Sequence, residues 1–157
     1  MNQDDRFLSR AIELAQRNIE TGEGGPFGAV ITLEGEIIGE GWNQVVARND
    51  PTAHAEIQAI RAACAAVDTF HLPNSVLYAS SEPCPMCMAA IYWARIGRVV
   101  FANSRNEAAA IGFCDDELYC ELSLPFGERR IAIEHRPISG ADTLFHLWAK
   151  NPKRILY

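Results

Sequence analysis

The sequence of 157 residues lacks any apolar run of 18 residues, any internal repeat and any low-complexity tract. A membrane-spanning helix needs about 20 mostly apolar residues, so we expect no membrane partner. The first residues, MNQDDRFLSR, are polar and of mixed charge. They have neither the apolar stretch of a signal peptide nor the basic bias of a transit peptide, and we therefore expect a cytoplasmic protein.

Basic residues are also scarce, because 14 Lys and Arg stand against 20 Asp and Glu and the net charge is −6. Binding along a nucleic-acid backbone depends on a basic surface that neutralises phosphates. We therefore expect no general binding to nucleic acid, although a local basic groove is compatible with this charge.

Cysteine occurs at only five positions, namely Cys64, Cys84, Cys87, Cys114 and Cys120. An odd number of cysteines in a chain of this size argues against a disulfide scaffold and for a reducing compartment. Metal binding or catalysis is then the alternative use. The sequence assigns no role to Cys64, Cys114 or Cys120.

Hydrophobic residues make up 48% of the chain and charged residues 22%, which is typical of a globular domain. The length corresponds to one domain, and we expect residues 1–157 to form it. Apolar spacing and turn residues predict alternating helices and strands. The expected helices cover 4–20, 54–66, 84–95, 106–111 and 143–150, the last with Asp142 as its cap. The expected strands cover 27–33, 36–42, 76–79, 98–102 and 130–135.

This alternation predicts an α/β fold, a three-layer α/β/α sandwich with helices on both faces of one sheet. The first two strands are separated only by Glu34-Gly35, which indicates an antiparallel hairpin. The remaining strands are connected through helices. The sheet is therefore expected to be mixed and five-stranded.

Two short motifs carry the chemistry, HAE at 54–56 and PCPMC at 83–87. Cys84 and Cys87 are three residues apart at a helix start, so both thiols lie on one helical face. The positive end of the helix favours their thiolate forms. With His54 they make three ligands, and zinc bound by three protein ligands keeps a fourth position open for catalysis.

Glu56 lies two residues after His54, which in an ideal helix separates the side chains by about 200°. At a helix N-terminus, where the first residue is only half helical, both side chains can still reach one cavity. We interpret Glu56 as a proton shuttle that does not bind the metal. A CxxC motif alone also occurs in redox pairs and in structural zinc sites, where Cys114 and Cys120 would complete a Cys₄ set. HxE followed by PCxxC is the signature of zinc-dependent nucleobase deaminases.

On these motifs the chain resembles the cytidine-deaminase-like zinc superfamily and, within it, the bacterial guanine deaminases. The resemblance spans nearly the whole chain. It is carried by GGPFGAVI (24–31), NDPTAHAEIQAIRAAC (49–64), SSEPCPMCMAAIYWARIGRVVFA (80–102), IGFCDDELYCEL (111–122) and RILY (154–157). The first three stretches are shared in part with bacterial tRNA adenosine deaminases. The last two stretches and the absence of a basic C-terminal tail favour guanine deaminase.

The resemblance implies that His54, Cys84 and Cys87 bind one zinc ion per subunit and that Glu56 moves protons. In a guanine deaminase, a zinc-activated water attacks C2 of guanine. The products are xanthine and ammonia, and the reaction is a step of purine metabolism. The resemblance therefore implies a hydrolase whose substrate is a small purine.

The resemblance also implies which residues contact the purine, namely Phe27, Asn43, Ala55, Trp93, Asp115 and Tyr157. The Asn43 amide offers a donor and an acceptor in one plane, although an Asn in such a loop, taken alone, is more often a loop cap. Phe27 and Trp93, taken alone, are typical of a core. An ungapped match selects Asp115 over its neighbour Asp116, and assigns Asp115 both substrate contact and proton transfer.

In the guanine deaminase family the C-terminal segment crosses to the partner subunit and closes its active site. The resemblance therefore implies a homodimer that exchanges residues 142–157, with RPISGA (136–141) as the hinge. Tyr157 is then expected at the site across the interface.

Other functions remain open on the same residues. A tRNA adenosine deaminase would act on a flipped anticodon base and would need basic residues to hold the RNA. A deaminase of another heterocycle, such as cytosine, isoguanine or an aminotriazine, is a further alternative, because fold does not determine substrate. A zinc-stabilised binding module would leave Glu56 idle and the fourth ligand position unused, and both features argue against it.

Overall fold

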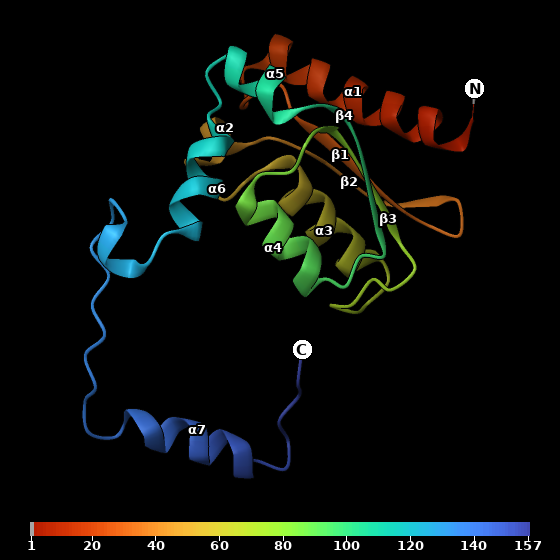
Figure 1. Cartoon of the computed structure of the whole chain (residues 1–157). Helices are drawn as coiled ribbons and strands as arrows, with labels where there is room; N and C mark the ends of the chain where they lie inside the picture. The colour runs from red at the N-terminus through yellow and green to blue at the C-terminus, as the bar shows by residue number, and fades with distance from the viewer. Residues whose placement is uncertain (1) are drawn as a thin grey trace. The chain divides into compact units, whose positions relative to one another are not determined.

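A computed structural model describes residues 2–157 of the chain, which divides into two units. The first unit ends at Tyr119 and the second spans Cys120–Tyr157. In Figure 1 the first unit is a sheet with helices on both of its faces, and the second contains α7.

One mixed sheet of four strands organises the first unit. Its strands are β1 (Gly28–Leu33), β2 (Glu36–Trp42), β3 (Val76–Ser81) and β4 (Arg98–Asn103), in the spatial order β2-β1-β3-β4. β1 is antiparallel to β2 and β3, whereas β3 and β4 are parallel. Glu34 and Gly35 have φ angles of 52° and 84°, as the two central residues of a tight hairpin turn require. The predicted hairpin and the mixed sheet are therefore confirmed.

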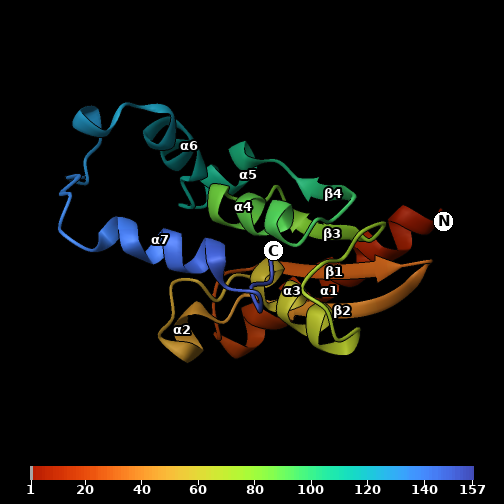
Figure 2. The same ribbon diagram turned by 90° about the horizontal axis from the view of Figure 1, so that it is seen from below.

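Helices cover both faces of this sheet, which confirms the predicted layers (Figures 1 and 2). The covering helices are α1 (Gln3–Thr21) on one face and α3 (Ala55–Ala66) and α4 (Pro85–Trp93) on the other. Successive residues of a strand point to opposite faces. Val30 therefore packs with Phe7 and Leu14 of α1, while Ala29 and Ile31 belong to the core beneath α3 and α4.

Two glycines of β2 allow α3 to approach the sheet closely. A Cβ atom at Gly41 would lie 2.3 Å from the Ala55 carbonyl oxygen, and one at Gly39 would lie 2.5 Å from the Ala59 carbonyl oxygen. Real Cβ atoms do not come so near to backbone atoms, so any larger residue would push the helix away. The glycines therefore set the position of the N-terminus of α3, where His54 lies.

The fifth strand predicted at 130–135 is wrong, because that segment is irregular and the described residues form a sheet of four strands. The alternation of Ile131 and Ile133 suggested a strand, but strand structure also needs a hydrogen-bonded neighbour. Both side chains are instead exposed. Asp142 is not the cap of α7 (Ala141–Lys150), because Gly140 occupies that position with a φ of 89°.

Four short helical segments complete the described chain. They are α2 (Val45–Arg48), α5 (Arg105–Ala110), α6 (Asp115–Ser123) and the 3₁₀ turn η1 (Phe126–Glu128). The helix expected at 106–111 corresponds to α5, whereas α2, α6 and η1 were not expected. None of the described helices combines the length and the apolar character needed to cross a membrane.

The second unit has no buried residue between Cys120 and Tyr157. Leu124 is partly buried. The other large apolar side chains of this unit are exposed, and they are Leu122, Phe126, Ile131, Ile133, Ile138, Leu144, Phe145, Leu147, Trp148, Ile155, Leu156 and Tyr157. This unit therefore contains no apolar core of its own.

Candidate active site

Three potential metal ligands from two helix starts lie together. His54 is the N-cap of α3 and Cys84 the N-cap of α4, where Pro85 occupies the first turn. His54 Nδ1 is 3.5 Å from Cys84 Sγ and 3.6 Å from Cys87 Sγ. The three donor atoms all lie within 4.8 Å of one another. The sequence motifs are therefore neighbours in space, as predicted.

The electrostatics of this cluster suit a metal ion. Hydrogen bonds from Cys87 and His54 lower the pKa of Cys84 to about 4, so that Cys84 is a thiolate. The hydrogen bond with Cys84 in turn raises the pKa of His54 and that of Cys87. The Cys84 thiolate therefore favours a cation held among the three donor atoms. Two sulfurs and one imidazole are a typical donor set of catalytic zinc.

Glu56 lies in the first turn of α3 and is 7% exposed. Burial raises the pKa of its carboxyl to about 7. Its Oε2 atom lies 3.4 Å from Cys87 Sγ. A carboxyl group that changes protonation near neutral pH is suited to accept and return a proton. His54 and Glu56 face the same cavity despite their separation by two residues, because His54 is extended and not helical.

A cavity of about 390 Å³ opens beside the cluster, which is within the range of small-molecule sites. Its lining residues are Gly25, Phe27, Asn43, Val45, Val46, Pro51, His54, Glu56, Glu82, Cys84, Phe113 and Asp115. The predicted contacts Phe27, Asn43 and Asp115 thus lie at one cavity with His54 and Glu56. The cavity can hold a small planar molecule against the candidate metal site.

Phe27 and Phe113 form an aromatic wall of this cavity. Their ring centroids are 4.8 Å apart and the rings are at 84° to each other. A Cβ atom at Gly25 would lie 2.8 Å from the Phe27 ring and 2.9 Å from the Phe113 ring, so the glycine leaves room for the pair. Sequence reasoning did not identify Phe113, although it lies in the same stretch as Asp115.

Asn43 is 4% exposed and its side chain is held by the backbone around it. Its Oδ1 atom accepts hydrogen bonds from Gly25 N at 3.3 Å and from Val45 N at 3.1 Å. The amide oxygen is therefore occupied, and Asn43 offers the cavity a donor through Nδ2. The sequence predicted that the Asn43 amide would offer the substrate both a donor and an acceptor. In the structure only the donor, Nδ2, is available to the cavity.

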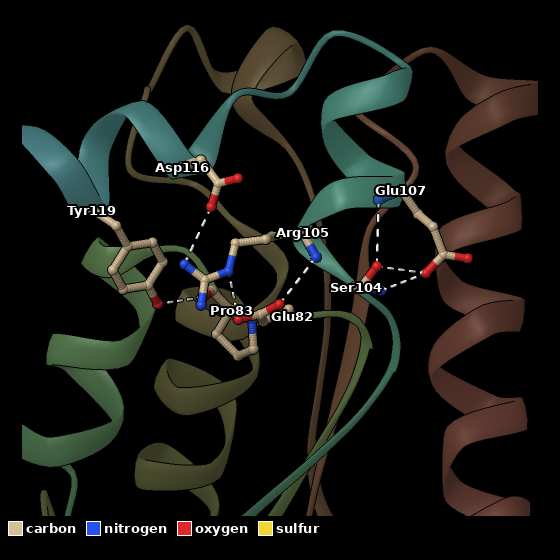
Figure 3. A network of polar contacts seen from close by, with 7 residues as sticks. All are labelled: Glu82, Pro83, Ser104, Arg105, Glu107, Asp116 and Tyr119. Carbon is tan, nitrogen blue, oxygen red and sulfur yellow. Dashed lines mark hydrogen bonds and ion pairs between the residues drawn. The ribbon is translucent and has the colours of Figure 1, made fainter.

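Asp115 begins α6, and burial raises the pKa of its carboxyl. Figure 3 shows the contacts that attach α6 to the segment before Cys84. Arg105 donates from Nε to Glu82 at 2.9 Å and from a terminal nitrogen to Asp116 at 3.2 Å. The Tyr119 hydroxyl donates to the carbonyl oxygen of Pro83 at 3.0 Å. These bonds, which sequence reasoning missed, position α6 beside the cavity.

Other expected contacts do not line the cavity. Ala55 is 1% exposed and belongs to the core, while Trp93 is 64% exposed at the end of α4. Tyr157 belongs to the second unit and is also exposed. Cys114 and Cys120 are free and exposed, and neither belongs to the metal-ligand cluster that the described residues form.

Comparison with known proteins agrees with this geometry. Residues 1–103 match the family model of the cytidine and deoxycytidylate deaminase zinc-binding region. The chain is 46% identical to guanine deaminase of Bacillus subtilis (strain 168) over 144 residues, or 92% of each chain. The X-ray structure of guanine deaminase from Bacillus subtilis gives a TM-score of 0.96 at 44% identity, over 100% of this chain and 99% of that one. A structure from work on tRNA:A34 deaminases gives a TM-score of 0.61 at 42% identity, over 64% of this chain and 72% of that one.

Proposed function

The chain belongs to the cytidine and deoxycytidylate deaminase family, and from this premise we propose that it hydrolyses guanine to xanthine and ammonia. The observation that carries the proposal is the similarity to guanine deaminase along the whole chain, with a TM-score of 0.96. The tRNA:A34 deaminase structure is similar over 64% of this chain. The structural match to guanine deaminase thus includes the C-terminal third of the chain.

The candidate zinc site consists of His54, Cys84 and Cys87. A zinc ion bound there supplies a Lewis acid that makes a water molecule far more acidic than it is in bulk. Guanine needs such help, because the carbon that carries its amino group is a poor electrophile. The chemistry requires one water per guanine and releases one ammonia.

Glu56 handles the protons of this reaction in our proposal. Its buried carboxyl lies beside the ligands and has a pKa of about 7. It accepts a first proton from the attacking water and gives it to a ring nitrogen of the purine, and then carries the second proton of that water from the new hydroxyl to the departing amine, which leaves as ammonia. Glu56, Glu82 and Asp115 are the carboxyl residues that line the cavity, and among them Glu56 is the one that forms a hydrogen bond with a ligand sulfur in the described part of the chain.

The cavity supports recognition of a flat base. Phe27 and Phe113 provide apolar surface against the rings, and Nδ2 of Asn43 provides a donor for a ring acceptor. Asp115 provides an acceptor for the N–H groups of the base, and its pKa, raised by burial, suits a second proton carrier.

The test is ammonia release by the zinc-loaded protein from guanine, guanosine, adenine, cytosine, an aminotriazine and an anticodon stem-loop RNA. We expect release from guanine and its loss in Glu56→Ala, which should keep its zinc. Release from the RNA alone would assign the protein to tRNA editing. Release from another free base alone would keep the mechanism but remove guanine as the substrate.

We also propose that the chain, as a single deaminase domain, forms a homodimer in which the two copies exchange residues 142–157. The exposed apolar side chains of the second unit support this proposal. Most of its large apolar side chains are exposed, including Leu144, Phe145, Leu147 and Trp148 of α7 and the later Ile155 and Leu156. Burial of such surface drives association. The partner's segment would then bring Tyr157, and the dimer would bring Trp93, to sites that the single chain leaves incomplete.

Complementation tests this exchange. A Glu56→Ala chain with an intact tail is mixed and refolded with a chain that has Glu56 but lacks residues 154–157. If the tail acts across the interface, one site of the mixed dimer has both features and activity returns. If each tail served its own chain, neither site would be complete and the mixture would stay inactive. A tail deletion that is fully active by itself would also contradict the exchange.

A further inference from the structure

Asn18 of α1 is a buried polar residue that does not line the cavity but bonds to two residues that do. It is 2% exposed. Its Nδ2 atom donates to the carbonyl oxygen of Gly25 at 2.8 Å and to that of Asn43 at 2.6 Å. One side-chain amide on the opposite face of the sheet from α3 and α4 thus joins the two segments that form one side of the cavity.

The amide oxygen of Asn18, unlike its nitrogen, forms no hydrogen bond with the described residues. This Oδ1 atom is also buried. An unsatisfied buried acceptor costs free energy, so a residue chosen for stability alone would avoid it. We therefore interpret the two bonds donated by Nδ2 as the reason why an asparagine occupies this position.

The bonds of Asn18 continue into the side chain of Asn43. The backbone nitrogen of Asn43 donates to the Phe27 carbonyl at 3.0 Å, and its carbonyl accepts from Asn18. Its Oδ1 atom then accepts from Gly25 N and Val45 N. Every acceptor and the backbone donor of Asn43 are thus engaged. Its Nδ2 atom has no acceptor among the described residues and remains for a ligand.

We propose that Asn18 is a positioning residue for substrate binding, because it fixes the backbone of Asn43 and Gly25 so that Asn43 Nδ2 presents its hydrogens to a ring acceptor of the purine. The inference rests on the proposed function for the identity of the ligand. Asn18 touches no substrate itself. Without its two bonds, the backbone of Gly25 and Asn43 is held less tightly, and substrate binding must then order it.

The first test replaces Asn18 by a residue of similar size that cannot donate. In zinc-loaded Asn18→Leu we expect KM for guanine to rise about tenfold while kcat changes less than about threefold, because a binding contact shared by ground state and transition state is weakened. Ser75→Ala is the matched control. Ser75 is also buried and its hydroxyl donates to the Leu72 carbonyl at 2.6 Å, but it is not part of the cavity. We expect its KM to stay unchanged.

A double-mutant cycle separates positioning from general support. If Asn18 acts through Asn43, then Asn18→Leu should add little to the KM of Asn43→Ala. Full additivity of the two effects would overturn the proposal. Asn18→Ser keeps one hydroxyl donor and room for a water. It should therefore give a smaller rise in KM, and it replaces Asn18→Leu in the cycle if that variant does not fold.

Hydrogen exchange gives a readout that does not depend on turnover. The backbone amides of Gly25 and Val45 donate to Asn43 Oδ1, so they should exchange faster in the Asn18 variant than in wild type or in Ser75→Ala. If the wild-type protein releases no ammonia from guanine, the proposed function is wrong, while the exchange at Val45 still decides the role of Asn18. Unchanged exchange at Val45 would overturn that role whatever the substrate.

Discussion

The two units of the chain differ in where their apolar side chains lie. The unit that ends at Tyr119 buries residues such as Phe7, Ile31 and Leu77 almost completely, whereas Cys120–Tyr157 buries none. The first unit contains all residues that line the candidate active-site cavity. Such a unit can hold ligands at fixed distances by itself. The second has the apolar residues for a stable structure but lacks a surface of its own to bury them against.

The largest effect is expected at the carboxyl group that the first unit buries. Glu56→Gln should lower kcat for ammonia release by about 10²–10⁴-fold, because the side chain keeps its shape but no longer carries a proton. Zinc content should not change. Glu40→Gln is the control, since Glu40 binds Arg10 at 2.7 Å and does not line the cavity. A Glu56→Gln protein with kcat within tenfold of wild type would contradict the assigned role.

The next prediction compares the substitution of one phenylalanine in each unit. Phe7 is 1% exposed and Phe145 is 79% exposed. Phe7→Ala should lower the free energy of unfolding by about 3–5 kcal/mol at any protein concentration. Phe145→Ala should weaken the proposed dimer, so its effect on the melting temperature should depend on concentration. Thermal unfolding at several concentrations distinguishes the two. A loss for Phe145→Ala that is independent of concentration would contradict exchange between chains.

Substitution of one glycine in each unit should show the same difference with a smaller effect on stability. Gly41→Ala would place a Cβ atom 2.3 Å from a backbone oxygen of α3, whereas a Cβ at Gly127 would meet nothing within 4 Å. Gly41→Ala should therefore cost about 1–3 kcal/mol of stability and raise the dissociation constant for zinc, because it displaces the start of α3. Gly127→Ala should change stability by less than about 0.5 kcal/mol. Equal losses in chemical denaturation would contradict this distinction between the units.

The smallest effect concerns ion pairs and pH. Hydrogen bonds from Arg98 and Tyr78 lower the pKa of Asp4 in the folded state. A lowered pKa of an acid contributes stability above its unfolded pKa, and this contribution disappears as pH falls through the folded pKa. Wild type should therefore exceed Asp4→Asn in melting temperature at pH 7, and the difference should shrink as the pH falls below the unfolded pKa of about 3.9. In the second unit, Glu134→Gln should show little difference, because its partner Arg136 is exposed to solvent. A difference for Asp4→Asn that grew toward low pH would contradict the shift.

Local patterns in the sequence were sufficient for most of the first unit. The spacing of Phe7, Ala11 and Leu14 predicts α1, and the turn at Glu34-Gly35 predicts the hairpin, because neighbouring residues alone satisfy a helix or a tight turn. The strand expected at 130–135 failed for the opposite reason. A strand is completed by hydrogen bonds to a distant segment, which alternation of apolar residues cannot supply.

The sequence by itself determined the chemical groups of the candidate site, since HAE and PCPMC place a histidine, two cysteines and a carboxyl group at helix starts. Only the tertiary structure decided which groups surround them. Phe113 and Glu82 lie in stretches that resemble the family but were assigned no role from the sequence, and Asn18 lies outside those stretches. Their roles depend on distances between segments that are far apart in the chain. A motif identifies reactive residues that are close together in the sequence. The residues that surround them at the cavity come from distant segments, and the packing of α1, α6 and the sheet brings these segments together.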